Sequence, residues 1–260
     1  MTVLDVKGVK MGEGRAKTIV SLMDPVEAEL LASARRAVHA GADCVEWRAD
    51  FAQDVHDPRA LCETGLRLLD ALPHTPLVFT LRSEEQGGRS RATRDEVARL
   101  LRAIIDARAT DLIDIESSMG DDAVHDLVGR AHVQGIHSIV SHHDFTCTPS
   151  TTWMVHKLKH MASMGAHMPK LAVMARSTSD CLRLMEATAM AHDELETPLI
   201  TMAMGAEGAL SRLAGEAVGS ALTFCALEKP SAPGQVGLRE ATLVLDGLHR
   251  VLPVLPSRVR

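Results

Sequence analysis

The sequence predicts an α/β protein in which eight parallel strands, each followed by a helix, close into a single (β/α)8 TIM barrel. Short β-rich runs recur along the chain, and a longer helical pattern follows each of them. The length of 260 residues suits such a barrel, which usually needs ~250 residues. No linker rich in Pro, Gly or Ser divides the sequence, so we expect one domain over residues 1–260.

The eight expected strands are spaced 23 to 35 residues apart along the chain. They begin near Lys17, Asp43, Pro76, Asp111, Ile136, Met168, Pro198 and Ala221. The spacing leaves room for one helix after each strand, which is the repeat of a closed parallel barrel. An open, doubly wound sheet is the alternative architecture, although it would normally use fewer strands.

Local signals mark several element boundaries. Residues 2–9 contain a glycine and are expected to form a short hairpin before the first barrel strand. Asp24-Pro25 and Thr148-Pro149 each offer a helix N-cap followed by a proline suited to the first helical position. Gly41 is placed to end the first helix. Prolines in residues 252–260 predict an irregular C-terminal tail.

Composition excludes several classes of partner. The net charge of −6 gives no overall basic surface, so we expect neither nucleic acid nor an anionic membrane as a partner. A local arginine cluster could still bind an anionic small molecule. No apolar run is long enough to span a bilayer. The five cysteines are scattered and lack C-x-x-C spacing, which favours a reduced, cytoplasmic compartment.

Polar side chains are expected to gather at the carboxyl end of the barrel. Alternation along a strand turns Val45 and Trp47 toward the helices and leaves Glu46 and Arg48 inside. The same reasoning applied to the other strands predicts a convergent inward set: Ser21, Glu46, Arg48, Arg82, Asp114, Glu116, His143 and Lys170. Active sites of such barrels lie at this end.

Lys170 is the most informative member of this set, because it lies within the apolar stretch 168–174. A desolvated lysine is disfavoured as an ammonium ion, and a neutral amine is the nucleophile that forms an imine with a ketone. His143, at the end of the preceding strand, could move protons beside it. A metal site built from His142 and His143 with Glu46 or Glu116 is a further possibility, but strand alternation separates the two histidines.

Six sequence blocks, taken together, resemble type I 3-dehydroquinate dehydratase over nearly the whole chain. In order they are Val45-Glu46-Trp47-Arg48-Ala49-Asp50, Phe79-Thr80-Leu81-Arg82-Ser83, Ser141-His142-His143-Asp144-Phe145, Pro169-Lys170-Leu171-Ala172-Val173-Met174, Ser211-Arg212-Leu213-Ala214-Gly215-Glu216 and Ser231-Ala232-Pro233-Gly234-Gln235. Their joint occurrence in this order is specific, whereas each block alone is not.

The resemblance implies a barrel, usually a homodimer, that dehydrates 3-dehydroquinate to 3-dehydroshikimate on the shikimate route to aromatic compounds. It makes Lys170 the imine-forming amine and His143 the general base and then general acid. It assigns substrate binding to Ser21, Glu46, Arg48, Arg82, Arg212, Ser231 and Gln235. It implies neither a metal nor an organic cofactor. Residues 229–235, after the last strand, could form a lid over the barrel mouth.

One position departs from the family pattern. Gln86 stands where the family usually has a glutamate that is thought to orient the catalytic histidine. An amide oxygen can still accept a hydrogen bond but supplies no negative charge, so a lower His143 pKa and weakened activity are expected. Alternatively, the loop shifts and Glu85 takes the position.

Two other functions remain open from the residues alone. A class I aldolase, or another imine-forming barrel, could use Lys170 in the same way. A catalytically weakened barrel that binds a hydroxylated carboxylic acid would retain the site without turnover. Measured turnover of 3-dehydroquinate distinguishes both from the dehydratase.

Overall fold

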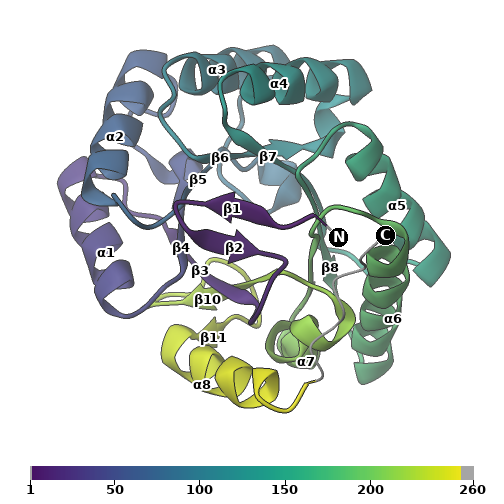
Figure 1. Cartoon of the computed structure of the whole chain (residues 1–260). Coiled ribbons are helices and arrows are strands. Elements are labelled where there is room, and N and C mark those ends of the chain that lie inside the picture. Colours follow the sequence, from purple (N-terminus) through teal and green to yellow (C-terminus); the bar gives the residue numbers. More distant parts are fainter. Residues whose placement is uncertain (1, 253–260) are drawn as a thin grey trace.

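The computed structural model describes residues 2–252 and contains a nine-stranded parallel sheet that curls into a barrel (Figure 1). The eight barrel strands are β3 (Lys17–Leu22), β4 (Cys44–Arg48), β5 (Leu77–Thr80), β6 (Leu112–Glu116), β7 (His137–Asp144), β8 (Met168–Met174), β9 (Ile200–Met204) and β10 (Leu222–Ala226). A bridge between Leu199 and Ser220 joins the last two strands and closes the ring. The predicted (β/α)8 barrel is therefore confirmed, and the strands begin within two residues of the expected positions.

Helices surround the sheet on its outer side (Figure 1). They are α1 (Glu27–His39), α2 (Pro58–Ala71), α3 (Arg94–Asp106), α4 (Asp121–Val133), α5 (Thr151–Ser163), α6 (Thr178–Glu194), α7 (Ala209–Leu213) and α8 (Leu238–His249). Short 3-10 turns follow four strands, at Ala49–Phe51, Glu84–Gln86, Ser117–Met119 and Ala206–Gly208, and a fifth, Gly215–Val218, follows α7. A two-residue strand, β11 (Val236–Gly237), pairs with β10 beyond the ring.

The expected N-terminal hairpin is present as β1 (Leu4–Val6) and β2 (Val9–Met11). Its turn places Gly8 at φ +82°, a conformation that glycine adopts without strain. Leu4, Val6 and Met11 are buried against the inward apolar side chains of the barrel strands. The hairpin thus lies across the amino end of the barrel (Figure 1) and leaves the carboxyl end for the site.

Two of the predicted helix caps are wrong. Helix α1 begins at Glu27, after Val26, and has no side-chain cap, so Asp24-Pro25 does not start it. Helix α5 begins at Thr151, and its cap is Ser150, whose hydroxyl accepts a hydrogen bond from the backbone N–H of Trp153. Thr148 instead donates its hydroxyl proton to the carbonyl of Met174 at 2.8 Å, because a tertiary contact competes for it.

Gly41 follows the end of α1 with φ +90°, as expected of a helix-ending glycine. The predicted irregular tail, residues 252–260, lies outside the described residues except for Leu252.

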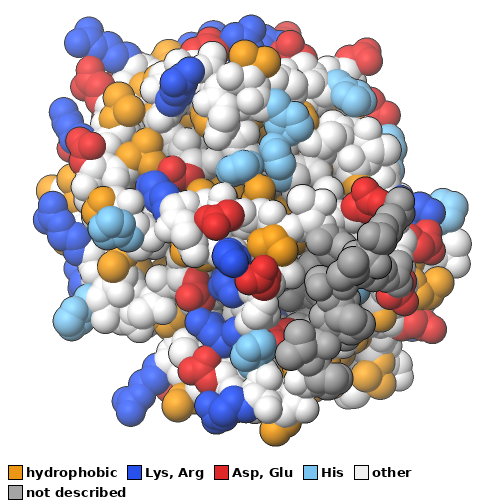
Figure 2. Space-filling view, viewed as in Figure 1, with side chains coloured by type: hydrophobic (Ala, Val, Ile, Leu, Met, Phe, Trp, Pro, Cys, Tyr) orange, Lys and Arg blue, Asp and Glu red, His pale blue; other side chains and the backbone are white. Residues whose placement is uncertain are grey.

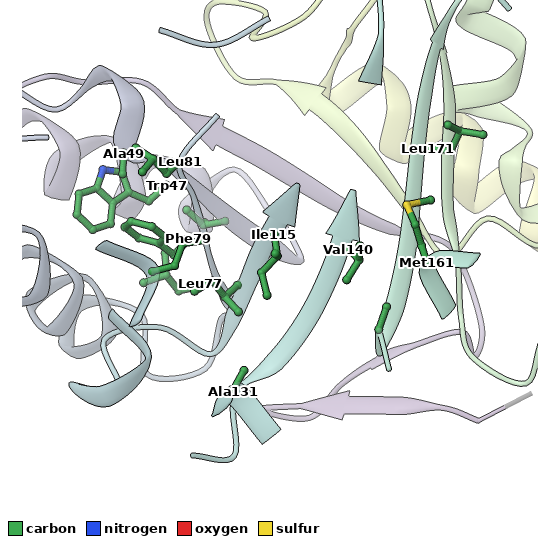
Figure 3. Close-up of a cluster of buried hydrophobic side chains, with 14 of the residues drawn as sticks. Trp47, Ala49, Leu77, Phe79, Leu81, Ile115, Ala131, Val140, Met161 and Leu171 are labelled. Carbon is green, nitrogen blue, oxygen red and sulfur yellow. The ribbon is translucent and has the colours of Figure 1, made fainter. Parts of the chain in front are cut away.

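The apolar core has two layers that follow the predicted strand alternation. Outward side chains pack between sheet and helices, and Figure 3 shows Trp47, Phe79 and Leu171 among them. The rings of Trp47 and Phe79 meet edge to face at 5.2 Å between centroids. Inward side chains, including Ile19 and Ile139, fill the barrel near the hairpin. Each fully buried side chain of this size contributes about 1.5–3 kcal/mol.

Charges are interspersed on the face that surrounds the hairpin, where Lys and Arg alternate with Asp and Glu (Figure 2). Within residues 2–252, no helix is long and apolar enough to cross a membrane.

Candidate active site

A cavity opens at the carboxyl ends of the barrel strands. Eight of the nine side chains predicted for the site line it, namely Glu46, Arg48, Arg82, His143, Lys170, Arg212, Ser231 and Gln235. The ninth, Ser21, is brought to the site indirectly: its hydroxyl donates to Oε2 of Glu46 at 2.5 Å. Strand alternation accounts for five of these lining residues, and the family resemblance for Arg212, Ser231 and Gln235.

Lys170 extends inward from β8 and is 3% exposed. Its Nζ lies 3.0 Å from Oδ2 of Asp114 and 3.9 Å from Oε1 of Glu46. The Phe224 ring lies on the amine at 4.3 Å from Nζ to the ring centroid. Two carboxylates and an aromatic face therefore surround the amine, and both carboxylates belong to the predicted inward set.

Asp114, on β6, is the anion at the centre of this arrangement. Arg82 donates from Nη2 to Oδ2 at 2.8 Å, and Ser141 donates its hydroxyl proton to Oδ1 at 2.5 Å. Burial alone would raise the pKa of Asp114, but the Arg82 and Lys170 cations outweigh it and hold that pKa well below its usual range. Asp114 is therefore ionised at neutral pH.

Arg82 has both terminal nitrogens engaged by protein groups. Besides Asp114, it donates from Nη1 to Glu116 and to Ser141, each at 3.0 Å. Burial would lower the pKa of Arg82, but these carboxylates raise it above its ordinary value. Arg82 thus lines the cavity while its charge is already balanced by Asp114 and Glu116.

His143 is fixed by Gln86. The amide oxygen of Gln86 accepts from the backbone N–H of His143 at 2.9 Å and lies 3.0 Å from Nδ1. The amide nitrogen of Gln86 donates to Glu116 at 3.1 Å and to Ser118 at 2.8 Å, which sets which end of the amide faces the histidine. His143 therefore carries its proton on Nδ1 and keeps Nε2 as the basic nitrogen.

The pKa of His143 lies well below its ordinary value. Burial is the main cause, and the Arg82 and Lys170 cations lower it further. Glu85 is exposed, whereas Gln86 is buried beside the histidine, so the alternative in which Glu85 replaces it is wrong.

His142 faces the opposite side of the sheet. Its ring packs against Trp153 of α5 at 5.6 Å between centroids, and burial lowers its pKa. The two adjacent histidines therefore cannot share a metal ion. Across residues 2–252, no group of three or more His, Cys, Asp or Glu side chains is arranged to hold one.

Arg48 lies at the end of β4 and is paired with Asp50, a residue that the sequence reasoning missed. It donates from Nε and from Nη2 to the two carboxylate oxygens of Asp50, both at 2.8 Å. Asp50 also accepts from the backbone N–H of Arg89 at 3.0 Å. The sequence signal that could have identified Asp50 is an acidic residue two positions after an arginine expected to face inward.

Arg212, on α7, differs from the other two arginines because most of its donors are free. Nη2 donates to the carbonyl of Pro233 at 3.3 Å, while Nε and Nη1 are buried without a protein partner. Burial lowers the pKa of Arg212 to about 10. The unpartnered N–H groups of this desolvated guanidinium are available to bind an anion such as a carboxylate.

Three residues of the segment 229–235, namely Ser231, Ala232 and Gln235, line the cavity. Ser231 and Gln235 bond each other, through the backbone N–H of Ser231 at 2.7 Å and the Gln235 amide nitrogen at 2.8 Å. The carbonyl of Pro233 accepts from the backbone N–H of Gly205 at 3.2 Å, which ties the loop to β9. Gly234 has φ +78°, and a Cβ there would lie 2.2 Å from the Gly205 oxygen.

Apolar side chains form the rest of the lining. Sequence reasoning did not assign Met202, Met204 and Phe224 to the site, although strand alternation on β9 and β10 could have found them. The remaining lining residues are Gln86, Gly87, Phe145, Ala172 and Ala232. A charged floor beside an apolar wall suits a small anion with a carbon ring.

Comparisons with known proteins agree with this geometry. The model of the family Type I 3-dehydroquinase matches residues 18–251. The 3-dehydroquinate dehydratase of Bacillus licheniformis is 40% identical over 248 residues, covering 95% of this chain and 98% of that protein. Its counterpart in Escherichia coli K12 is 39% identical over 251 residues, covering 96% and 100%.

Solved structures give the same result. A type I 3-dehydroquinate dehydratase from Clostridium difficile, solved with covalent modified comenic acid, has a TM-score of 0.93 and 37% identity, covering 96% of this chain and 99% of that one. The 3-dehydroquinate dehydratase of Geobacillus kaustophilus also has a TM-score of 0.93, with 33% identity and coverage of 97% and 98%.

Proposed function

The chain belongs to the type I 3-dehydroquinase family and is a 3-dehydroquinate dehydratase of the shikimate pathway, and we propose that it works through an imine on Lys170. The observation that carries this mechanism is the position of Nζ, buried in the cavity against Asp114 and Glu46. His143 lines the same cavity and has a basic Nε2.

Imine formation is the first step. The Lys170 nitrogen attacks the substrate ketone, the carbon–oxygen double bond becomes a carbon–nitrogen double bond, and the oxygen leaves as water. The protonated imine withdraws electrons from the adjacent carbon and so acidifies its C–H bond. A free lysine attacks poorly as an ammonium ion, so a proton must leave Nζ within the closed site before attack.

Elimination follows at the acidified carbon. Nε2 of His143 removes the proton, the electron pair forms the new carbon–carbon double bond, and the β-hydroxyl leaves with the proton that His143 returns. Hydrolysis of the imine then releases the conjugated enone and restores the amine. The low pKa of His143 keeps its Nε2 unprotonated and ready for this role at neutral pH.

Arg212 is the proposed partner of the substrate carboxylate, because its Nε and Nη1 are free and buried. Glu46, Arg48, Ser231 and Gln235 line the cavity where the substrate hydroxyls would lie, and Ser21 orients Glu46. Arg82 is proposed to contact the substrate from a position held by Asp114 and Glu116.

We also propose a single domain over residues 1–260, a homodimer, and a cytoplasmic location, with no organic cofactor in the reaction. The barrel spans the described residues as one closed sheet. Five free cysteines suit a reducing compartment.

The test of this mechanism combines turnover and trapping. The protein is incubated with 3-dehydroquinate, the ultraviolet absorbance of the conjugated enone is followed, and borohydride is then added. The expected result is enone formation and a reduced adduct that mass spectrometry maps to Lys170. Enone formation without an adduct at Lys170 would overturn the imine mechanism while leaving the activity in place.

A further inference from the structure

Asp114 occupies a position that the reaction described above does not yet use. Its Oδ2 accepts from Lys170 Nζ at 3.0 Å and from Arg82 Nη2 at 2.8 Å, so one carboxylate oxygen bridges two buried cations. Asp114 is itself 3% exposed, and water cannot substitute for it. Burying such charges is costly unless good geometry and further hydrogen bonds offset their desolvation, and Asp114 has such bonds from Ser141 and Arg82.

The charge on Nζ is the same before and after imine formation. An ammonium ion and a ketone give a protonated imine and one molecule of water: the C=O bond breaks, a C=N bond forms, and two of the three N–H protons leave with the oxygen. One positive charge stands at Nζ before and after the step. The carboxylate that balances the resting amine can therefore balance the intermediate without moving.

Other groups facing Nζ fit this role less well. Glu46 lies farther away, at 3.9 Å, and its two oxygens already accept from Ser21 and Thr80. Phe224 offers a ring face but no charge. The other ionisable side chains that line the cavity are the cations Arg48, Arg82 and Arg212 and the neutral His143. They disfavour a further positive charge, so an anion beside Nζ is needed.

We propose that Asp114 is the counter-ion that keeps the Lys170 imine protonated during turnover, an inference that rests on the imine mechanism proposed above. A neutral imine is a poor electron sink, so only the protonated form acidifies the adjacent carbon. Ser141 and Arg82 hold Asp114 ionised and fix its orientation toward Nζ.

The proposal predicts a specific change in the pH profile of kcat. Without the anion, the imine loses its proton at lower pH, so the basic limb of the kcat profile shifts to lower pH. The expected shift for Asp114→Asn is about one pH unit or more, the usual effect of an opposite charge at this distance. Asn keeps the shape of the side chain, and a role in folding alone would lower kcat without moving the limb.

Glu116→Gln is the matched control. It removes the other carboxylate on Arg82, but no contact joins Glu116 to Nζ. It should lower kcat through Arg82 and Gln86 and shift the basic limb much less than Asp114→Asn. Equal shifts in both variants would overturn the counter-ion role, because a general loss of negative charge would then explain them.

Ser141→Ala gives a second measurement should Asp114→Asn fail to fold. It removes the hydroxyl that donates to Oδ1 and weakens the hold on Asp114, so a smaller shift in the same direction is expected. Borohydride trapping of each variant separates the two proposals. A Lys170 adduct in the unsubstituted enzyme with an unmoved basic limb in both Asp114→Asn and Ser141→Ala refutes the counter-ion role alone, whereas no adduct in the unsubstituted enzyme refutes the imine itself.

Discussion

Gln86 and His143 are joined twice through one oxygen: the amide Oε1 of Gln86 lies 2.9 Å from the backbone nitrogen and 3.0 Å from Nδ1 of the histidine. The amide nitrogen of Gln86 is anchored on Glu116 and Ser118. A neutral amide thus orients the base where the family usually has a carboxylate. The orientation of His143 is kept, and the nearest carboxylate in this chain of hydrogen bonds is Glu116, on the far side of Gln86.

The first prediction concerns this charge. Gln86→Glu should raise the pKa of His143, because an anion beside Nδ1 favours the charged ring. Activity needs the unprotonated base, so the acidic limb of the kcat profile should move to higher pH by up to about one unit. Gln86→Leu is the control without an acceptor. It should lower kcat at least about tenfold, equivalent to ~1.4 kcal/mol, by releasing the ring.

The same reasoning predicts that the unsubstituted enzyme has a lower kcat than the Gln86→Glu variant, and that the acidic limb of its kcat profile lies at lower pH. A kcat that Gln86→Glu leaves unchanged, together with an acidic limb that does not move, would show that the charge at position 86 has no influence on His143.

Lys170 and His143 are expected to fail at different steps. Lys170→Ala should abolish both turnover and the trapped adduct, since no other amine is in the cavity lining. His143→Ala should still form the imine but stall at elimination, with a loss of about 10²–10⁴-fold in kcat. Mass spectrometry after borohydride, run beside the kinetic assay, checks both. Loss of the adduct in His143→Ala would give the histidine a role in imine formation as well.

Arg212 should govern recognition of the substrate carboxylate. Arg212→Lys keeps a cation but loses the unpartnered guanidinium N–H donors, so kcat/KM should fall about 10- to 100-fold, as expected for a lost charged hydrogen bond of ~1.5–3 kcal/mol. Most of the effect should appear in KM. Arg91→Lys, on an exposed arginine paired with Glu84, is the matched control and should change neither constant. A full-strength Arg212→Lys enzyme would exclude this carboxylate site.

A cluster of histidines away from the cavity predicts acid sensitivity. Nδ1 of His167 accepts from the backbone N–H of Ser138 at 3.0 Å and lies 3.1 Å from Nε2 of His132. Burial, followed by His132 and His137, lowers the pKa of His167 to about 4. Because its folded pKa lies below its unfolded value of ~6.5, the free energy of unfolding is highest above pH 6.5 and falls as pH drops toward 4.

Urea unfolding at pH 7 and pH 5 measures this effect. His167→Gln should reduce the pH dependence by on the order of 1–2 kcal/mol, a value that allows for solvent screening of a partly exposed ring. His39→Gln, on an exposed histidine at the end of α1, serves as control. A slope that is the same in both variants would assign the acid sensitivity to other groups.

Strand alternation in the sequence predicted much of the candidate site. Glu46, Arg48, His143 and Lys170 face inward because successive residues of a strand point to opposite faces, and this holds for any well-paired strand. Pairing within the site was beyond that reasoning. Which member of the inward set contacts Lys170 depends on how side chains from several strands pack in one enclosed space, and in the structure it is Asp114.

The errors at the helix starts have the same origin. Thr148 is a good cap by its chemistry, yet its hydroxyl bonds the carbonyl of Met174 and Ser150 takes the cap. A local rule cannot weigh a competing partner from another element. Arg212 illustrates a further limit, because it lies on α7 and no strand periodicity points to it; only the resemblance did.

The hairpin closes the amino end of the barrel. Leu4, Val6 and Met11 pack across that end, so substrate enters, and water and enone leave, at the opposite end, where the cavity opens. The loop of residues 229–235 stands at that opening. Among the described residues, substrate and products therefore share this opening. In the proposed mechanism, the water released on imine formation leaves while the substrate is already bound to Lys170.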